Sequence, residues 1–421
     1  MLKPPKSRGV ALATATLGLT LSSFSLTTYA AFLEDSRAFL EARNFYMNRD
    51  FRQPNASQNY RGEWAQGFIL KYESGFTDGI VGLGLDAIGT WGIRLDSGRG
   101  RSGTDLLPVY ANGDVPGQYG SWGATAKARI SKTTIRYGTL IPKTMPILEP
   151  SDSRLLPQWF RGLQLTTQEI KNLNVDAGRL TMNKQRNWDR EEKLTAVNRG
   201  MTGLTNTNQF DFVNASYKLT KDLTFGYSFA NLDKNYTQHY FTILHMLPIT
   251  ETQSLKTDLR LSRAYNDGNT NIDNWSMQGM FTYKIGGHSI AAAVQKMAGK
   301  TGFTYVNGTN PWLVNYIQIQ DFANPRERSW QLRYDYDFAA MGVPGLIFMT
   351  RYVKGWDFER SVGGPANGRE WERNTDIAYV FQNGLLKNLS LRWRNATVRS
   401  NDNGSDIDEN RFIVGYKISL L

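Results

Sequence analysis

Large apolar side chains alternate with polar ones in steps of two along much of the chain. The short stretch "LSLRWR", residues 389–394, shows the pattern clearly. It separates two sets of residues, apolar Leu389, Leu391 and Trp393 and polar Ser390, Arg392 and Arg394. A helix, with its period of 3.6 residues, would mix the two sets, whereas a β-strand places them on opposite faces. The stretch therefore predicts a strand with one apolar face and one cationic face.

The same alternation recurs in hairpins. One hairpin spans residues 211–232 around a turn at 220–222, and another begins with residues 275–285 and turns at Gly286 and Gly287. Longer polar, glycine-rich segments separate such hairpins, for instance residues 96–120, 265–274 and 358–374. Short turns that alternate with long loops predict a barrel with turns at one rim and loops at the other. No linker divides these hairpins, so we expect one domain.

The chain length sets the size of this barrel. A strand of about ten residues with its loop or turn repeats roughly every 22 residues, which gives about eighteen strands. Barrels of about 16 to 18 strands leave an aqueous lumen, whereas eight-stranded barrels fill with side chains. We therefore expect an all-β fold, a transmembrane antiparallel β-barrel with short periplasmic turns and long extracellular loops.

A soluble β-sandwich would also alternate apolar and polar residues, because one face of each sheet packs on the other sheet. Two features favour the membrane barrel. Aromatic residues recur near strand ends, as Trp275 and Tyr283 do, which is typical of interfacial girdles. The chain also closes on the strand-like "RFIVGYKISLL", residues 411–421, which would pair with the first strand.

The first thirty residues differ from the rest. Lys3, Lys6 and Arg8 precede an apolar stretch rich in Thr, Ser and Gly, and small residues follow up to Ala30. This arrangement predicts a signal peptide over residues 1–30 and a barrel domain over residues 31–421. Its removal lowers the formal charge from +11 to +8, so the mature chain stays basic. The chain has no cysteine and no later apolar run near eighteen residues, which excludes disulfides and helical membrane spans and leaves a closed barrel.

The basic residues fall on the polar faces of the predicted strands. Lys127 and Arg129 alternate with alanines in "ATAKARIS", residues 124–131. A charge on the lipid side would cost about 2–4 kcal/mol near the bilayer midplane, so we expect these groups to face water in the lumen. A column of guanidinium groups there would concentrate anions and pass a carboxylate from one bidentate partner to the next. The alternative is that each arginine neutralises an inward carboxylate such as Asp86 or Asp258.

Several segments together resemble one family. They are "FLEDSRAFLEARNFYMNRDFRQ", "WAQGFILKYESGFTDGIVGLGLDAIG", "AKARISKTTIRYGT", "SRLLPQ", "SWQLRYDYDFAAMGVPGLIFMTRYVKG" and "NGLLKNLSLRWRN". This set is similar to the OprD family of substrate-specific outer-membrane porins, in order and through essentially the whole mature chain. The resemblance implies an eighteen-stranded barrel narrowed by loops that fold into the lumen. It also implies a basic ladder along one wall that guides carboxylate-bearing nutrients.

The resemblance assigns residues to this ladder and to a constriction. With Arg129 from the alternation, the ladder would comprise Arg49, Arg61, Arg129, Arg351, Arg392, Arg394 and Arg411. Arg154 in "SRLLP" would lie at the constriction. Asp321 would face the ladder there and could select the ammonium end of a solute.

Two positions depart from members that favour basic amino acids. A tyrosine of those members is Ile319 here, and a ladder lysine found in some members is Ala378. The segments "GREWERNTDIAYV" and "LRWRNATVRS" look closer to the branch that prefers carboxylates with cyclic or aromatic bodies. We therefore expect small organic or aromatic acids, with amino acids as a second possibility.

Other classes of function receive less support from the sequence. An outer-membrane lipase or protease would need a positioned nucleophile and base, but His239, His245 and His288 are the three histidines and none lies in a catalytic motif. A nucleic-acid-binding protein would not carry a secretory signal, and its charge would not lie on strand faces. We expect no enzyme activity, cofactor or metal. As partners we expect outer-membrane lipid and lipopolysaccharide and small carboxylate solutes, with a weak homotrimer left open.

Overall fold

The computed structural model describes residues 32–53, 56, 58–359, 363–401 and 406–421. The predicted signal peptide therefore lies outside the described residues. The strands are β1 (Arg37–Phe51), β2 (Tyr60–Glu73), β3 (Gly82–Asp96), β4 (Gln118–Ile130), β5 (Thr133–Leu140), β6 (Trp159–Thr167), β7 (Leu173–Lys184), β8 (Glu191–Glu192), β9 (Phe210–Lys218), β10 (Leu223–Leu232), β11 (Tyr236–Pro248), β12 (Gln253–Asn266), β13 (Asp273–Ile285), β14 (His288–Gly299), β15 (Arg328–Asp337), β16 (Leu346–Phe358), β17 (Gly368–Val380), β18 (Leu389–Ser400) and β19 (Ile407–Ser419).

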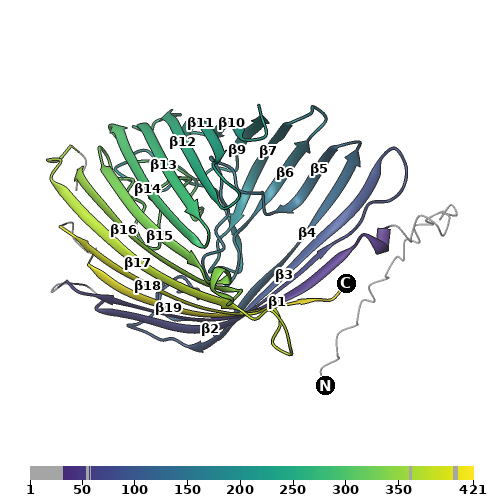
Figure 1. Ribbon diagram of the computed structural model, residues 1–421, viewed down its shortest axis with the longest axis horizontal. Coiled ribbons are helices and arrows are strands. Elements are labelled where there is room, and N and C mark those ends of the chain that lie inside the picture. Colours follow the sequence, from purple (N-terminus) through teal and green to yellow (C-terminus); the bar gives the residue numbers. More distant parts are fainter. Residues whose placement is uncertain (1–31, 54–55, 57, 360–362, 402–405) are drawn as a thin grey trace, which may run out of the picture.

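Eighteen of these strands close an antiparallel barrel, as the alternation predicted (Figure 1). Each long strand pairs with its neighbours in the chain, and β1 pairs with β19 from Phe39↔Ser419 to Phe51↔Ile407. The short strand β8 pairs only with β7, beside the β7–β9 ladder. A short 3₁₀ helix, η1 (Phe338–Met341), lies between β15 and β16. The described residues contain no helix long and apolar enough to cross a membrane.

The longest connections all lie at one end of the barrel. The connection between β4 and β5 is residues 131–132 and that between β13 and β14 is residues 286–287, whereas residues 300–327 join β14 to β15. We name the two ends of the barrel the turn rim and the loop rim after these connections. The backbone of Gly286 has a φ of 55°, a left-handed conformation that glycine adopts without steric cost and that a tight hairpin turn requires.

Large apolar side chains cover the outer face of the barrel. Trp122 on β4 is 82% exposed and Val294 on β14 is 61% exposed. Similar outward residues on other strands include Tyr137, Leu163, Phe225, Phe241, Phe281, Leu332 and Phe412. A soluble protein rarely exposes so continuous an apolar surface. The outer face therefore fits hydrocarbon, in agreement with the expected membrane barrel.

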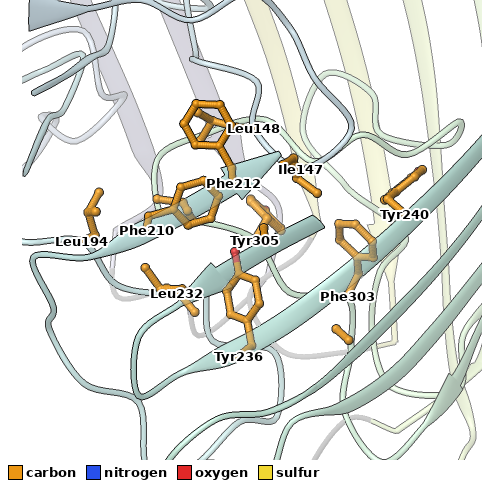
Figure 2. Packing of buried hydrophobic residues seen from close by; sticks show 14 of the residues in the cluster. Ile147, Leu148, Leu194, Phe210, Phe212, Leu232, Tyr236, Tyr240, Phe303 and Tyr305 are labelled. Atoms are coloured by element: carbon orange, nitrogen blue, oxygen red, sulfur yellow. The ribbon is translucent and has the colours of Figure 1, made fainter. Parts of the chain in front are cut away.

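Three loops fold inward and build a core inside the barrel. The loops are residues 141–158, 185–209 and 300–327, which we call L3, L4 and L7. Figure 2 shows Phe303 and Tyr305 of L7 next to Tyr236 and Tyr240 of β11, with Tyr240 and Phe303 ring centroids 6.5 Å apart. Isolated β-bridges join L3 to L7 at Glu149↔Asn310 and L4 to L7 at Ala196↔Val306. The loops thus pack on each other and on the wall, and narrow the lumen.

The strands next to L3 are short, and this places L3 deep inside the barrel. β5 has 8 residues and β6 has 9, whereas β1 has 15. The chain therefore leaves the wall at Leu140 before it has reached the height of the longer strands. Apolar residues of L3 then meet the inner wall, where Leu155 and Leu156 pack in a second buried cluster with Phe45 and Met47 of β1.

Candidate functional site

The predicted cationic face of β18 points into the barrel. Arg392 and Arg394 both approach Asp376, which stands directly opposite Arg394 on β17. The Asp376 carboxylate lies 2.8 Å from Arg392 Nε and 3.0 Å from Arg394 Nε. The neighbouring residue Leu391 points outward and is 41% exposed. The alternation in "LSLRWR" therefore distinguishes residues that face the lumen from residues that face lipid.

One carboxylate serves two arginines in this pair. The Arg392 side chain remains 46% exposed although it binds Asp376. The Nε–H of Arg394 is close to Asp376 but is not aligned for a hydrogen bond, and it has no other partner among the described residues. Two positive charges against one negative charge leave a net positive charge at the lumen surface.

Glu409 on β19 is shared in the same way. Its fully buried carboxylate lies 2.6 Å from Arg49 Nη2 and 2.6 Å from Arg411 Nε. Loop L7 covers this pair, because Gln318 Nε2 donates to Glu409 at 3.0 Å and Arg411 Nη2 donates to the Gln318 carbonyl at 3.0 Å. The Arg411 side chain is consequently 1% exposed. This differs from the expected position on the ladder, since Arg411 supports the loop and is shielded from water.

The strand register lines up other ladder arginines in one row across the strands. A belt of residues, each directly opposite the next on the adjacent strand, runs through Arg351, Asn374, Ala396, Glu409, Arg49 and Arg61. Directly opposite residues of a strand pair share one face. The belt thus extends from β16 through β19 and β1 to β2.

Arg351 and Arg61 have no carboxylate within 4.0 Å among the described residues. Arg351 Nε donates to the Asn374 side chain at 2.7 Å. Arg61 Nη1 donates to the Gly103 carbonyl at 3.0 Å, and its guanidinium lies 4.9 Å from the centre of the Phe51 ring. Neutral partners orient both guanidinium groups without cancelling their charge.

Arg154 lies on L3 beside the belt. Its Nε donates to the Thr104 carbonyl at 2.9 Å, and its Nη2 lies 3.9 Å from Asp105. Burial and then the nearby guanidinium groups of Arg411 and Arg186 lower the pKa of Arg154. The constriction thus gathers several cations close to the belt.

Asp105 sits among these cations. Arg186 on L4 lies 3.1 Å from the Asp105 carboxylate. Although burial opposes it, the charges of Arg154 and Arg186 lower the pKa of Asp105, which therefore stays ionised. One carboxylate again faces two guanidinium groups.

Asp321 on L7 is occupied by other loop residues. It forms an ion pair with Arg199 of L4, and the Tyr305 hydroxyl donates to it at 2.6 Å. Burial works against the charge of Arg199, but Asp321 and Tyr305 together outweigh burial and raise the pKa of Arg199. The carboxylate is nearly buried and its charge is balanced within the loops. Asp321 thus fastens L7 to L4 and does not face the ladder as an unpaired acid.

Arg129 lies apart from the other ladder residues. It is on β4, next to the turn rim, and its guanidinium is 4.1 Å from the centre of the Phe76 ring. Strand β3 separates β4 from β2, which carries Arg61. The structure therefore brings together Arg49, Arg61, Arg351, Arg392, Arg394 and Arg411 and leaves Arg129 on a different stretch of wall.

The alternative neutralisation predicted from the sequence also occurs. Asp86 lies 2.5 Å from Lys127 Nζ, and Asp258 lies 2.9 Å from Arg260 Nη2. Gly84 makes room for the first pair, because a Cβ there would lie 2.5 Å from Lys127 Cε and 2.8 Å from the Gly75 carbonyl. On β4 and β12, therefore, inward carboxylates neutralise Lys127 and Arg260.

The sequence analysis did not identify two arginines that lie near the constriction. Arg43 on β1 donates to Asp152 at 2.8 Å and to the Arg154 carbonyl at 2.7 Å, and could have been found by counting back in steps of two from Arg49. Arg186 lies in an irregular loop and no periodic signal points to it.

Two of the histidines lie beside tyrosine hydroxyls. His239 Nδ1 is 2.9 Å from the Tyr227 hydroxyl, and His288 Nδ1 is 2.8 Å from the Tyr334 hydroxyl, so both lie among exposed aromatic residues. Within the described residues, no three His, Asp or Glu side chains are grouped so as to hold a metal ion. The chemistry of the lumen is that of charge and hydrogen bonding.

Comparisons with known proteins agree with this fold. Residues 30–420 match the model of a family described as outer membrane porin, OprD family. The porin-like protein GalP of Pseudomonas putida is 36% identical, with 93% of each chain covered. The crystal structure of Pseudomonas aeruginosa OpdQ is 49% identical with a TM-score of 0.86, covering 93% of this chain and 100% of OpdQ.

A further similar structure is that of a relative solved with vanillate. The crystal structure of Pseudomonas aeruginosa OpdK with vanillate is 36% identical with a TM-score of 0.84, covering 92% of this chain and 100% of OpdK. The closed barrel, its inward loops and these matches lead to one conclusion: this chain belongs to the OprD family of substrate-specific porins of the Gram-negative outer membrane.

Proposed function

We propose that this porin lets small carboxylate-bearing solutes diffuse passively across the outer membrane along its arginine wall. The solute class comprises organic and aromatic acids. The ladder would consist of Arg49, Arg61, Arg351, Arg392 and Arg394, with Arg411 holding L7 in place behind it. No cofactor or catalytic step is required. A barrel lipase or protease receives no support from the surroundings of His239 and His288.

One observation carries this proposal, namely that two carboxylates of one wall are each shared by two guanidinium groups. Asp376 is shared by Arg392 and Arg394, and Glu409 by Arg49 and Arg411. A lumen with low-dielectric walls and excess positive charge raises the local concentration of anions. The excess charge, rather than the mere number of arginines, therefore favours carboxylates.

The geometry also supports a stepwise path. Arg392 is the more exposed member of its pair, and its Nη1 has no hydrogen-bond partner among the described residues, because its bonds to Asp376 use Nε and Nη2. An entering carboxylate could take over donors that are only partly used, so that part of its lost hydration is replaced. Several weak contacts in series allow release, whereas one tight site would trap the solute.

The size limit would come from L3 and L7. Arg154 and Asp105 hold the tip of L3 beside the belt, and Gln318 holds L7 over Glu409. The relative OpdK, solved with vanillate, was crystallised with an aromatic carboxylate. We extend to this chain the preference for a carboxylate on a cyclic or aromatic body.

The apolar outer face and the loop rim of the barrel would each meet a different part of the outer membrane. Outer-membrane lipid would meet the apolar outer face, and lipopolysaccharide would meet the loop rim. Export by a signal peptide over residues 1–30 is part of the same proposal. The barrel may be tested for a weak homotrimer by its mass in mild detergent.

The main experiment compares carboxylate uptake by wild-type and variant barrels. We expect Arg392→Ala with Arg394→Ala to reduce benzoate-driven current in planar bilayers about tenfold, since two guanidinium groups of the wall are lost. This double variant leaves Asp376 uncompensated, so a triple variant with Asp376→Asn restores local neutrality. Uptake should remain low in the triple variant.

The control is Lys221→Ala, which removes a charge from an exposed turn far from the arginine wall. It should leave the benzoate current unchanged. If the double and triple variants pass benzoate as well as wild type does, the arginine wall does not guide the solute.

A further inference from the structure

A second basic region lies in the lumen, away from the arginine wall. A cavity of about 940 Å³ runs along the inner faces of β2–β9. It reaches Ser131 and Lys132 at the turn rim and ends at residues 141–144, where the chain leaves β5 for L3. A solute that has passed the constriction therefore meets this cavity before it leaves the barrel.

The cations of this cavity are largely unpaired. Its basic residues are Lys71, Lys127, Arg129, Lys132, Arg136 and Lys143, and its acidic residues are Glu73, Asp86 and Asp176. Among the described residues, Lys127 alone of these cations has a carboxylate within 4.0 Å. The Arg136 guanidinium donates instead to the Thr166 hydroxyl at 3.2 Å. This contrasts with the arginine wall, where carboxylates are shared.

The register places hydrogen-bonding groups in a row across this cavity. Thr134, Thr166, Asp176 and Asn214 stand directly opposite one another on β5, β6, β7 and β9. The next inward position on β5 is Arg136, which stands opposite Gln164. Gln164 Nε2 in turn lies 3.4 Å from the Asp176 carboxylate. The row thus combines a cation that can bind an anion, Arg136, with the amide donors of Gln164 and Asn214 and the carboxylate acceptor of Asp176.

We infer that this cavity is a second solute site, selective for carboxylates that carry several hydroxyl groups. The inference rests on the proposed function, since it takes a carboxylate channel as given. The carboxylate would bind Arg136 and Lys143. The hydroxyls would donate to Asp176 and accept from Asn214 and Gln164.

Asp176 supplies the discrimination. A carboxylate with an alkyl body would place apolar groups against the Asp176 carboxylate and the Asn214 amide, and would remove their water without replacing it. A hydroxylated body satisfies the same groups. A charged acceptor beside cations is thus a filter for hydroxyls, whereas cations alone would bind any anion.

The test uses two acids with the same charge and number of carbons. Gluconate carries a hydroxyl on every carbon except the carboxyl carbon, and hexanoate carries none. The dissociation constant of each acid is measured from solute-induced current noise, with the acid added on the side of the turn rim. Wild type should bind gluconate about tenfold more tightly than hexanoate.

Two variants separate charge from hydroxyl recognition. Arg136→Gln with Lys143→Gln should weaken both acids about tenfold, whereas Asp176→Asn should weaken gluconate alone and narrow the ratio between the two. Resistance of each barrel to unfolding in SDS confirms that it is folded, and Lys221→Gln serves as the charge control. The inference is overturned if gluconate binding by the Asp176→Asn barrel stays within about twofold of wild type.

The ladder variant Arg392→Gln with Arg394→Gln distinguishes the two proposals. It should reduce the flux of both acids but leave the gluconate-to-hexanoate ratio of dissociation constants unchanged. Full flux in this variant, together with lost gluconate binding in the Asp176→Asn barrel, would refute the ladder and retain the cavity site. If the ladder variant loses flux but the Asp176→Asn barrel keeps the wild-type gluconate-to-hexanoate ratio of dissociation constants, the cavity site is refuted and the ladder is retained.

Discussion

Glu409 organises the arginine wall from a fully buried position. Its carboxylate contacts Arg49, Arg411 and Gln318, which come from β1, β19 and L7. Breaking a buried ion pair by removing one partner is costly, because the remaining charges stay out of water. A single carboxylate therefore joins the barrel seam to the constriction loop.

We predict that Glu409→Gln lowers the free energy of unfolding by about 3–5 kcal/mol, since it leaves Arg49 and Arg411 without an anionic partner. Urea titration of the barrel in lipid vesicles, followed by tryptophan fluorescence, measures this change. The matched control is Glu251→Gln in an exposed turn between β11 and β12, which should change the stability by less than about 0.5 kcal/mol. Equal stabilities of the two variants would contradict the role given to Glu409.

The residues of the wall were partly predictable from local alternation. Arg392 and Arg394 follow from the two-residue period of β18, and Arg43 could have followed from that of β1. Their partners were not predictable in the same way, because Asp376, Glu409 and Gln318 reach them through strand register and loop folding. The burial of Arg411 and Asp321 could not be predicted for the same reason: each is covered by a segment distant in sequence.

At the scale of elements, L7 is fastened along its length by side chains of the wall. Gln278, Gln295 and Gln331 project from the adjacent strands β13, β14 and β15. Gln278 accepts from the Val314 N–H at 2.8 Å, and Gln331 donates to the Val314 carbonyl at 2.8 Å. Gln295 accepts from the Asn315 N–H at 3.1 Å and donates to the Phe322 carbonyl at 2.7 Å. The constriction is therefore a fixed part of the fold.

We predict that Gln295→Leu loosens L7, because it removes the hydrogen bonds of this side chain to the Asn315 N–H and to the Asp321 and Phe322 carbonyls, and leaves buried polar groups unpaired. Single-channel recordings should show more frequent transitions between conductance levels than wild type. Gln253→Leu, near the turn rim, removes a glutamine that bonds to Tyr283 and serves as the control. Quiet recordings from the Gln295→Leu channel would show that the loop does not depend on this anchor.

The end of L7 carries an acid whose ionisation opposes folding. Burial raises the pKa of Glu327 to about 7. Its Oε2 accepts from the Asn324 N–H at 2.9 Å, whereas its Oε1 and Glu370 Oε1 are buried and have no donor among the described residues. One proton shared between the two carboxyl groups would satisfy both oxygens. Because the folded-state pKa of Glu327 lies above the ordinary value, this carboxyl group holds its proton to higher pH in the folded barrel than in the unfolded chain.

The contribution of Glu327 to the free energy of unfolding is therefore fully present below about pH 4.5. It falls by on the order of 3 kcal/mol as the pH rises through about 7. We predict that wild-type barrels need less urea for half unfolding at pH 8 than at pH 5. Glu327→Gln should flatten this dependence over the same range, because an amide cannot ionise. A pH dependence that is identical in the variant would assign the effect to other groups.

At the scale of the whole molecule, the fold was predictable because the membrane imposes a simple rule. Each strand must show apolar side chains to lipid, so the alternation is visible in single segments such as residues 389–394 and 411–421. The inner core was not predictable, because the residues that build it come from L3, L4 and L7, which contain no period. Phe303, Tyr305 and Leu194 became core residues only through the packing of these loops on β9–β11.

Adjacent residues on β9 offer a direct test of the membrane arrangement. Val213 points outward and is 40% exposed, whereas Asn214 points into the lumen opposite Asp176. We predict that Val213→Arg lowers the free energy of unfolding in lipid vesicles by about 2–4 kcal/mol, since it brings a charge into hydrocarbon. Asn214→Arg adds the same side chain one residue later, where water and the Asp176 carboxylate can accommodate it, and should cost less than about 1 kcal/mol. Equal costs for the two substitutions would mean that this stretch of wall does not separate lipid from water.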